Sequence, residues 1–216
     1  MPLLVSLGLA CAVSYLIGAI PTAYIFGKIY KKIDIRQFGS GNIGAANTFR
    51  VLGKGPGIAV LLLDIAKGLV PTAFVAPVAG LTQVFSLVAI GLCAVVGHNW
   101  TIFLNFRGGK GIATSLGVLI GLAINIPGLG IAVLACLLAW AVVFLVTGYV
   151  SLASIIASIL LPAIILATRQ SLGVVTLGVI FCVFVVLRHR PNIQRLFLGK
   201  EPQVNWPFRR TPLKND

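Results

Sequence analysis

Long apolar runs separated by short polar segments make up most of the chain. A bilayer core about 30 Å thick needs about 20 mainly apolar residues for each helix that crosses it. The runs that come near this length predict transmembrane helices over 3–27, 56–77, 80–97, 112–125, 127–146, 149–168 and 171–187. The fourth run is short and is followed by Pro127 and Gly128, so a split or re-entrant helix is an alternative there. The pattern predicts an all-α integral membrane protein with seven transmembrane helices.

The composition agrees with this fold class. Hydrophobic residues make up 58% of the 216 positions and charged residues only 10%, whereas about a quarter of the residues in a soluble domain are charged. We expect a single transmembrane domain over residues 1–216. The first apolar run is too long for the core of a cleaved signal peptide and has no basic segment before it. We therefore interpret it as the first spanning helix.

Positive charge is concentrated in three polar segments. The chain has 17 Lys and Arg against 4 Asp and Glu, a formal net charge of +13. All the basic residues except Lys67 and Arg169 fall at 28–55, at 98–111 or in the tail that begins at Arg188. Cytoplasmic loops of membrane proteins carry the excess of Lys and Arg, which predicts a cytoplasmic C-terminus and an external N-terminus. Such cations also attract anionic lipid. Because they flank membrane helices, we expect no nucleic-acid partner.

The first polar segment contains "QFGSGNIGAANTFR", in which Gly39, Gly41 and Gly44 have the spacing of a dinucleotide-binding loop. The surroundings exclude that interpretation, because no buried strand precedes the loop and a membrane helix follows it. The acid that could bind a ribose, Asp64, lies inside an apolar run. An anion-binding loop and a flexible turn between helices are the alternatives that remain.

Glycine-rich loops bind phosphate because backbone N–H groups can converge on an anion where no Cβ intervenes. The backbone from Gly39 to Asn42 offers such groups, and Ser40 and Asn47 add short polar side chains. Arg50 adds a bidentate donor of the kind that suits phosphate. The chemistry of this segment therefore favours an anion site.

The second polar segment, "GHNWTIFLNFRGGKGIATSLG", has similar chemistry. Gly108 and Gly109 stand between Arg107 and Lys110. The loop resembles a Walker A loop, but glycine and isoleucine follow the lysine where a Ser or Thr would bind magnesium. We interpret it as a second anion site, without metal. His98, at the end of the third apolar run, either contacts the substrate or caps its helix.

The third polar segment, "LRHRPNIQRLFLGKE", places His189 between two arginines, with Asn192 three positions later. Neighbouring cations disfavour a charged imidazole, which suits a neutral base or a hydrogen-bonding group. A structural histidine at a helix end is the alternative.

Two ionisable residues lie within the second apolar run. Asp64 and Lys67 are three positions apart and share one helix face. Ionisable residues at membrane depth are functional or paired with one another. Lys67 therefore either pairs with Asp64 or reaches toward the cytoplasmic site.

Missing features narrow the function. A magnesium-dependent phosphotransferase needs clustered carboxylates, and Asp34 and Asp64 are the only acidic residues before position 201. A Ser-His-Asp hydrolase would show a G-x-S-x-G motif, which the sequence lacks. A transporter of a small phosphorylated anion is the main alternative, and it would be expected to have polar residues near mid-bilayer, broken helices and often an internal repeat. Polar residues gathered at one face favour chemistry on a cytoplasmic anion.

The three segments together resemble the motifs of the PlsY family, the acyl-phosphate-dependent glycerol-3-phosphate acyltransferases of bacterial membranes. The stretch "DIRQFGSGNIGAANTFR" is similar to the first family motif, "GHNWTIFLNFRGGKGIAT" to the second and "HRPNIQRLFLGKE" to the third. The resemblance covers nearly the whole chain. It implies a seven-helix fold in the bacterial inner membrane, with motif segments near 28–55, 98–111 and 188–201 forming an active site that faces the cytoplasm.

The resemblance implies transfer of a fatty acyl group from acyl phosphate to the 1-hydroxyl of glycerol 3-phosphate. The products would be lysophosphatidic acid and phosphate, in the first step of phospholipid synthesis, and no cofactor or metal is implied. The implied partners are the two substrates, membrane lipid and the soluble enzyme PlsX, which supplies acyl phosphate. We expect direct attack of the hydroxyl on the acyl carbonyl, with a covalent acyl-Ser40 intermediate as the alternative.

The matching positions also imply roles for individual residues. We expect Ser40 to stabilise the oxyanion or the leaving phosphate, and His189 and Asn192 to orient the attacking hydroxyl. The expected substrate-binding residues are Gly39, Gly41, Asn42, Asn47, Arg50, Lys67, His98, Arg107, Gly108, Gly109, Lys110 and Ser151.

The chain departs from the common family pattern at four positions, Ala46, Arg107, Pro191 and Lys200, where the family has Thr, Lys, Glu and Thr respectively. The change at Ala46 removes a hydroxyl that could contact phosphate.

Overall fold

The computed structural model describes residues 2–204, which contain helices and no strand. The all-helical prediction is confirmed, and each of the predicted apolar runs is helical over most of its length. The α-helices are α1 Leu3–Ala19, α2 Thr22–Lys31, α3 Ala45–Leu52, α4 Lys54–Val70, α5 Ala76–Val78, α6 Val84–Asn99, α7 Ile112–Asn125, α8 Leu129–Thr147, α9 Val150–Ala167, α10 Leu172–Arg188 and α11 Arg190–Phe197. Short 3-10 helices lie at Ile35–Gln37 (η1) and Ile102–Leu104 (η3), and a π-helix at Pro71–Val75 (η2) joins α4 to α5.

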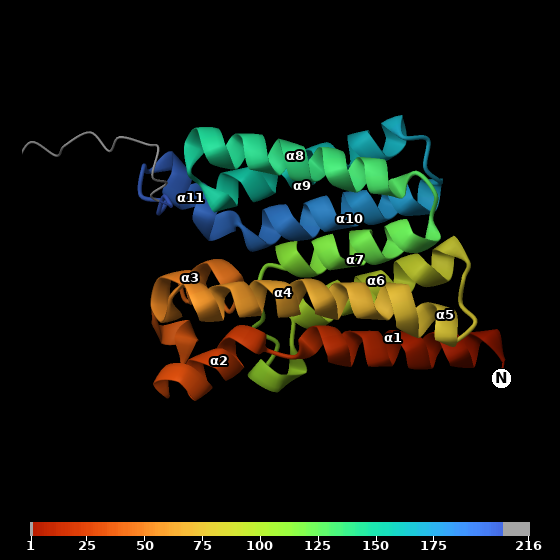
Figure 1. Cartoon of the computed structure of the whole chain (residues 1–216), viewed down its shortest axis with the longest axis horizontal. Helices are drawn as coiled ribbons and strands as arrows, with labels where there is room; N and C mark the ends of the chain where they lie inside the picture. The colour runs from red at the N-terminus through yellow and green to blue at the C-terminus, as the bar shows by residue number, and fades with distance from the viewer. Residues whose placement is uncertain (1, 205–216) are drawn as a thin grey trace, which may run out of the picture.

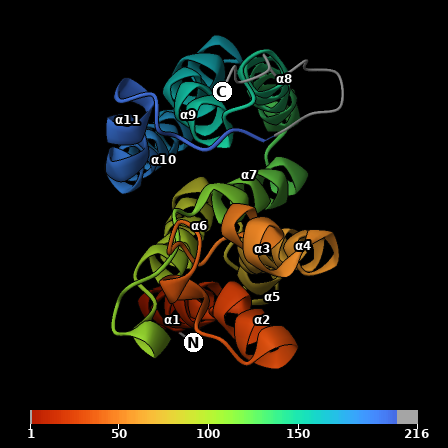
Figure 2. The same ribbon diagram turned by 90° about the vertical axis from the view of Figure 1, so that its left-hand side faces the viewer.

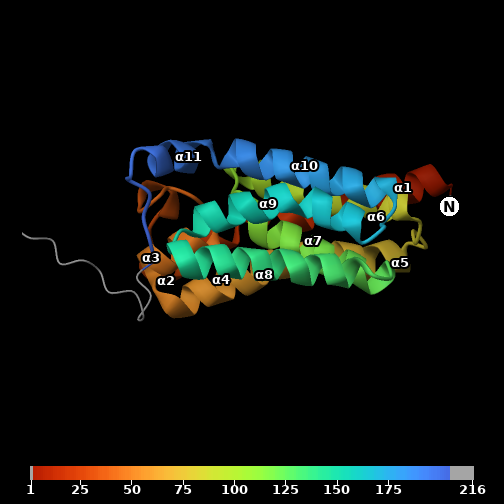
Figure 3. The same ribbon diagram turned by 90° about the horizontal axis from the view of Figure 1, so that it is seen from above.

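The long helices lie side by side along one axis (Figures 1 and 3). Seen along that axis, α1 to α7 form one group and α8 to α11 another (Figure 2). Contacts of α7 with α8 and of α6 with α10 join the two groups. The N-terminus lies at one end of the bundle, and α2, α3 and α11 lie at the other (Figure 1). The polar segments that contain these helices therefore lie far from the N-terminus.

Several helical stretches are long and apolar enough to cross a membrane. By length and composition these are 5 stretches, Leu3–Lys31, Lys54–Val78, Val84–Leu104, Leu129–Thr147 and Val150–Ala167, among the described residues. The pair of α10 and α11, bent by 59°, raises the number to 6 if it counts as one span. Helix α7 has 14 residues and is therefore about 21 Å long, shorter than the hydrocarbon core. The chain is a multi-pass membrane protein, and its seven-span topology stays a prediction.

The predicted first helix over 3–27 lies within one candidate span, Leu3–Lys31, but the helix is interrupted within it. Helix α1 ends at Ala19, and Ile20 has a non-helical ψ of 116° before α2 begins. The next residue is Pro21, and proline disfavours the helical conformation in the residue before it. The interruption leaves the last carbonyl groups of α1 without partners in their own helix. Groups from other parts of the chain must bind them.

A second proline sets the bend between α10 and α11. Pro191 lies in the first turn of α11, where its missing N–H is tolerated. In the interior of a helix its ring would clash with the preceding turn, so α10 cannot continue straight through this position. The bend places His189 between the two helices. Helices α3 and α11 both lie in segments that the sequence predicts only as polar loops.

Glycines allow the helices beneath the polar segments to approach closely. A Cβ on Gly117 of α7 would lie 1.9 Å from the carbonyl oxygen of Ile65 in α4, and one on Gly97 of α6 would lie 2.2 Å from that of Tyr15 in α1. Small residues permit such contacts between membrane helices. The two helix pairs, α4 with α7 and α1 with α6, therefore form a closely packed support for the loops above them.

Candidate active site

Asn47 organises the first glycine loop. Its side-chain oxygen accepts a hydrogen bond from the Ser40 backbone N–H (2.8 Å), and its side-chain nitrogen donates to the carbonyls of Phe38 (3.1 Å) and Ile35 (3.3 Å). A Cβ on Gly39, where φ is +60°, would lie 2.3 Å from the Asn47 oxygen. The sequence predicts substrate contact for Asn47, but its side chain is 1% exposed and bonded at both ends. Asn47 holds the shape of the loop.

Residues 39–42 form the outer face of this loop. The N–H groups of Ser40 and Gly41 are bonded within the loop. Those of Gly39 and Asn42 have no hydrogen-bond partner among residues 2–204. The Ser40 side chain is in the exposed part of the loop. Two N–H groups and one hydroxyl are thus available to an anion, fewer than the sequence alone suggests.

The second glycine loop packs directly on the end of α6. The N–H of Gly108 donates to the Asn99 carbonyl (3.1 Å), and that of Gly109 donates to the His98 carbonyl (3.0 Å). A Cβ on Gly108 would lie 2.0 Å from the His98 carbonyl oxygen, and one on Gly109 would lie 2.2 Å from His98 Nε2. Close packing therefore requires glycine at both positions. Their N–H groups are occupied and do not form the anion cradle that the sequence predicts.

Arg188, at the end of α10, holds the other side of this loop. Its Nε donates to the Gly109 carbonyl (2.9 Å), and its second terminal nitrogen donates to the Gly108 carbonyl (2.7 Å). The guanidinium carbon also lies 5.7 Å from the centroid of the Trp100 ring. These contacts join the second polar segment to the third.

A hydrogen-bond network around Glu201 makes the second connection between these segments. The carboxylate accepts hydrogen bonds from Ser151 Oγ (2.7 Å), Asn192 Nδ2 (2.6 Å) and Arg195 Nε (2.8 Å). The side-chain oxygen of Asn192 accepts a hydrogen bond from the Lys110 ammonium. Burial raises the pKa of Glu201, but the bonds from Asn192, Ser151 and Arg195 outweigh it and hold the pKa below its usual range. Glu201 is therefore an ionised anchor for both Asn192 and Ser151.

Lys110 lies among other cations. Burial lowers the pKa of Lys110 to about 8, attraction to Glu201 opposes this shift, and repulsion from Arg195, Arg50 and Arg188 adds to it. One carboxylate thus faces four cations in this region. Such an imbalance attracts anions.

His189 is buried at the bend between α10 and α11, with 3% of its surface exposed. Its Nδ1 lies 2.8 Å from the Val185 carbonyl oxygen. A carbonyl oxygen can only accept, so Nδ1 carries the hydrogen and Nε2 of the neutral ring is left as an acceptor. This tautomer is the one that a base or a hydroxyl-orienting group needs.

A cleft of about 350 Å³ lies between the first and second polar segments. Arg36 forms a two-pronged contact with Asp34 at its edge, with distances of 2.7 Å and 3.0 Å, and this hydrogen bonding holds the pKa of Asp34 below its usual range. The exposed Arg107 has no ion-pair partner among residues 2–204. The cleft is lined by Asp34, Arg36, Gln37, Gly41, Ile43, Arg107 and Gly108.

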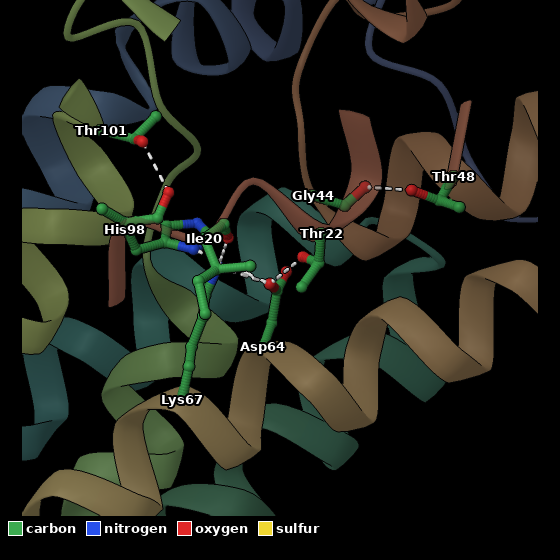
Figure 4. Close-up of polar contacts among 9 residues, drawn as sticks. Ile20, Thr22, Gly44, Thr48, Asp64, Lys67, His98 and Thr101 are labelled. Carbon is green, nitrogen blue, oxygen red and sulfur yellow. Dashed lines mark hydrogen bonds and ion pairs between the residues drawn. The ribbon is translucent and has the colours of Figure 1, made fainter. Parts of the chain in front are cut away.

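Lys67 and His98 are buried and lie close to Asp64 (Figure 4). Lys67 is 6% exposed and its Nζ lies 2.8 Å from Asp64 Oδ1. Of the two roles weighed for Lys67, the structure shows the ion pair. His98 is 4% exposed, and neither residue lines the cleft.

Sequence reasoning missed three residues of this region: Arg188, Glu201 and Thr22, which binds Asp64. Glu201 offered a signal, because a carboxylate within a strongly basic motif is expected to pair with its neighbours. Arg188 and Thr22 offered none, because their partners lie 80 and 42 positions away.

The fold and the site define a class: a helical membrane protein with a cationic, glycine-rich site at one end. Among residues 2–204, no three His, Cys, Asp or Glu side chains are grouped as metal ligands. The sequence model of the glycerol-3-phosphate acyltransferase family matches residues 8–199. The chain belongs to this family.

Individual relatives of the chain carry the name of the same family. A glycerol-3-phosphate acyltransferase of Gloeobacter violaceus is 41% identical over 198 residues, covering 91% of this chain and 94% of the relative. One of Staphylococcus saprophyticus is 45% identical over 200 residues, covering 89% and 95%. The crystal structure of PlsY, an integral membrane glycerol 3-phosphate acyltransferase, in its glycerol 3-phosphate form matches with a TM-score of 0.84 at 34% identity, covering 93% of this chain and 96% of that one. Its lysophosphatidic acid form matches with a TM-score of 0.81. The resemblance to the PlsY family is confirmed, and membership associates the chain with phospholipid biosynthesis.

Proposed function

We propose that the chain transfers a fatty acyl group from acyl phosphate to the 1-hydroxyl of glycerol 3-phosphate. One observation carries the proposal: the Lys110 ammonium, which is bonded to Asn192 beside the Glu201 carboxylate, lies close enough to Arg50, Arg188 and Arg195 to be repelled by all three. Repulsion among them is relieved when an anion binds between them. Both proposed substrates bear phosphate, and the similar PlsY structures are a glycerol 3-phosphate form and a lysophosphatidic acid form.

The two loops offer different groups to the two phosphates. We assign one phosphate to Lys110 and Arg107, beside the second loop. The other, on the acyl donor, is assigned to Arg50, the Ser40 hydroxyl and the free N–H groups of the first loop. Of the residues in the two loops, the cleft is lined by Gly41, Arg107 and Gly108, and we propose that the substrates meet at its edge, next to each other, as transfer between them needs.

In the proposed reaction, the oxygen of the 1-hydroxyl attacks the acyl carbonyl carbon. The ester bond forms, the bond from that carbon to the phosphate oxygen breaks, and phosphate leaves. The hydroxyl proton passes to His189 Nε2 or to a phosphate oxygen of the donor. The Ser40 hydroxyl and the N–H groups of Gly39 and Asn42 stabilise the oxyanion or the leaving phosphate. Phosphate is a good leaving group, so neither a metal nor a covalent nucleophile is required.

Asn192 takes a different role in this scheme from the one that the sequence suggests. Its amide is bonded to Lys110 on one side and to Glu201 on the other, so it orients Lys110 instead of the attacking hydroxyl. Ser151 acts through the same carboxylate. Substrate orientation is therefore assigned to His189.

We also propose a topology and a location. Seven spans, an external N-terminus and a cytoplasmic C-terminus in the bacterial inner membrane would put the site on the cytoplasmic side. The concentration of Lys and Arg in the polar segments supports this orientation. A site on that side could receive acyl phosphate from PlsX, and we propose that PlsX contacts the same face.

The test is turnover by the purified full-length protein, with palmitoyl phosphate and glycerol 3-phosphate as substrates. Mass spectrometry should detect lysophosphatidic acid and equimolar phosphate, with none formed from acyl-CoA or acyl carrier protein, and with chelator causing no loss. The Lys110→Ala variant serves as the control for background acyl transfer. Absence of product together with uptake of glycerol 3-phosphate into proteoliposomes would favour the transporter.

A second experiment separates direct transfer from a covalent route. Protein incubated with radiolabelled acyl phosphate alone should carry no label after denaturation, because no acyl-enzyme forms. A label that is retained by the unchanged protein and lost in Ser40→Ala would establish acyl-Ser40 and overturn direct transfer.

A further inference from the structure

Thr22, Asp64, Lys67 and His98 form a buried polar cluster (Figure 4), and its His98 contacts the second glycine loop. Asp64 Oδ1 accepts a hydrogen bond from Thr22 Oγ1 (2.5 Å) and pairs with Lys67 Nζ (2.8 Å). The same oxygen lies 3.9 Å from His98 Nδ1. All four side chains are nearly completely buried. None of them takes part in the proposed reaction.

The cluster binds the interruption between α1 and α2. Lys67 Nζ donates to the Ile20 carbonyl (2.9 Å), and Thr101, in the second polar segment, donates through Oγ1 to the Ala19 carbonyl (2.5 Å). Ala19 is the last residue of α1 and Ile20 follows it, and the Ile20 carbonyl also accepts the Thr22 N–H (3.0 Å). The interruption, the Asp64–Lys67 pair and the start of the second segment are thus bonded to one another.

His98 connects the cluster to the loop itself. Its Nε2 lies against Gly109, where a Cβ would be only 2.2 Å away, and its carbonyl accepts the Gly109 N–H. Arg188 fixes the opposite side of the same two glycines. The His98 ring thus lies between the loop and the Asp64–Lys67 pair. We infer that its position determines how closely the loop approaches the end of α6.

We propose that Asp64 and Lys67 are positioning residues, which place the Gly108–Lys110 loop at the height where substrate phosphate binds. The proposal rests on the proposed function, because it takes this loop as a phosphate site. His98 Nδ1 has no hydrogen-bond partner among the described residues, so the ring is not held by a bond of its own from the cluster. It is held by packing between Gly109 on one side and the Asp64–Lys67 pair on the other, and a change in either member of the pair lets the ring and the loop shift.

The test measures kcat and the KM for glycerol 3-phosphate in the full-length protein, for Asp64→Asn, Lys67→Met and Thr22→Val. A displaced phosphate-binding group loses the same interaction in the ground state and in the transition state, which raises KM and leaves kcat unchanged. We expect KM to rise about 10-fold or more in the first two variants and less in Thr22→Val, with kcat nearly unchanged, as for loss of uniform binding. Lys67→Arg, which keeps the charge, should restore most of the affinity. A purely structural role would instead lower the amount of active protein at constant KM.

A second readout does not depend on turnover. Trp100 follows the His98–Asn99 pair and contacts Arg188, and it becomes the only tryptophan of the 3 when Trp140 and Trp206 are replaced by Phe. In this background, Lys67→Met and Asp64→Asn should shift its emission and weaken quenching by inorganic phosphate, and Lys67→Arg should not. Ser158→Ala, which removes a buried hydroxyl bonded only within α9, is the control and should change neither readout.

The two readouts separate the failure of this inference from the failure of the proposed function. If the protein without these substitutions has no acyltransferase activity, but Trp100 emission still differs in the Asp64 and Lys67 variants, the proposed reaction is rejected and the positioning role is kept. Normal KM and identical Trp100 emission in Asp64→Asn and Lys67→Met would overturn the positioning role.

Discussion

The Lys110 ammonium donates a hydrogen bond to the side-chain oxygen of Asn192, a residue 82 positions further along the chain. The orientation of the amide is set by Glu201, because a carboxylate accepts from the amide nitrogen and leaves the oxygen for a cation. Lys110 is therefore held at a fixed point between the second and third polar segments. Its charge can be directed at a phosphate without a change of rotamer.

The first prediction concerns pH. Burial lowers the pKa of Lys110 to about 8 from a usual 10.5, so the ammonium of the free enzyme is lost as pH rises through about 8. Because phosphate binding needs the charged form, kcat/KM for glycerol 3-phosphate should fall above that pH, approaching tenfold per unit. Lys110→Arg should have lower activity but no such decline between pH 8 and 10, since arginine stays charged.

A loss of stability caused by Lys110 itself does not explain this decline. Between the folded pKa of about 8 and the usual 10.5, the unfolded chain holds a proton that the folded chain has lost. Stability from this group therefore rises with pH in that window, while activity falls. An identical decline in Lys110→Arg would show that a different group is responsible.

The second prediction concerns the tautomer of His189. Because its Nδ1 donates to the Val185 carbonyl, a neutral ring should have its lone pair on Nε2. Nitrogen NMR of protein labelled at its 2 histidines should give a pyridine-like shift for Nε2 and a pyrrole-like shift for Nδ1. His98→Gln assigns the signals by removing the other set. The opposite pair of shifts would contradict the acceptor role of Nε2.

The third prediction separates loop support from substrate contact at Asn47. Asn47→Asp keeps the acceptor for the Ser40 N–H but removes the donor to the carbonyls of Ile35 and Phe38. Leaving a buried polar group unsatisfied costs about 1–3 kcal/mol. The midpoint of thermal unfolding and the activity should therefore both fall. Asn42→Asp, which adds the same charge nearby without breaking these bonds, should change KM and leave unfolding unaffected. Equal unfolding midpoints in both variants would favour direct substrate contact by Asn47.

Helix positions follow from the sequence because apolar length and turn residues are local signals. The predicted run 112–125 matches α7, Ile112–Asn125, which begins after Gly111 at a φ of +77° and ends before Pro127. The interruption at Ile20 was also signalled, by a proline within an apolar run. The prediction gave no weight to Pro21, because the apolar run continues on both sides of it and is long enough for one helix.

The contacts within the site, in contrast to the helix positions, could not be predicted from the sequence. The residue types in the three polar segments indicate phosphate chemistry, but the partners of each group cannot be read from one sequence. Ser151 and Glu201 are 50 positions apart, and Gly109 reaches Arg188 over 79. Once such contacts form, the N–H groups of Gly108 and Gly109 are occupied, and an anion at this second loop must be bound by side chains. Tertiary contacts thus change the roles that we assign to individual residues of the predicted site.

The last prediction tests the helix support beneath the site. Gly117→Ala would place a methyl group 1.9 Å from the Ile65 carbonyl oxygen in α4, and because this neighbour is backbone, α4 and α7 must separate. Overpacking of this kind costs about 1–3 kcal/mol. Gly8→Ala is the matched control: its Cβ would meet nothing within 4 Å, and replacing a helical glycine by alanine stabilises by about 0.5–1 kcal/mol. In detergent or nanodiscs, the unfolding midpoint should fall for Gly117→Ala and hold or rise for Gly8→Ala. Equal midpoints would mean that α4 and α7 are not in the close contact described, and the Asp64–Lys67 pair on α4 would lose its fixed position relative to the loop that precedes α7.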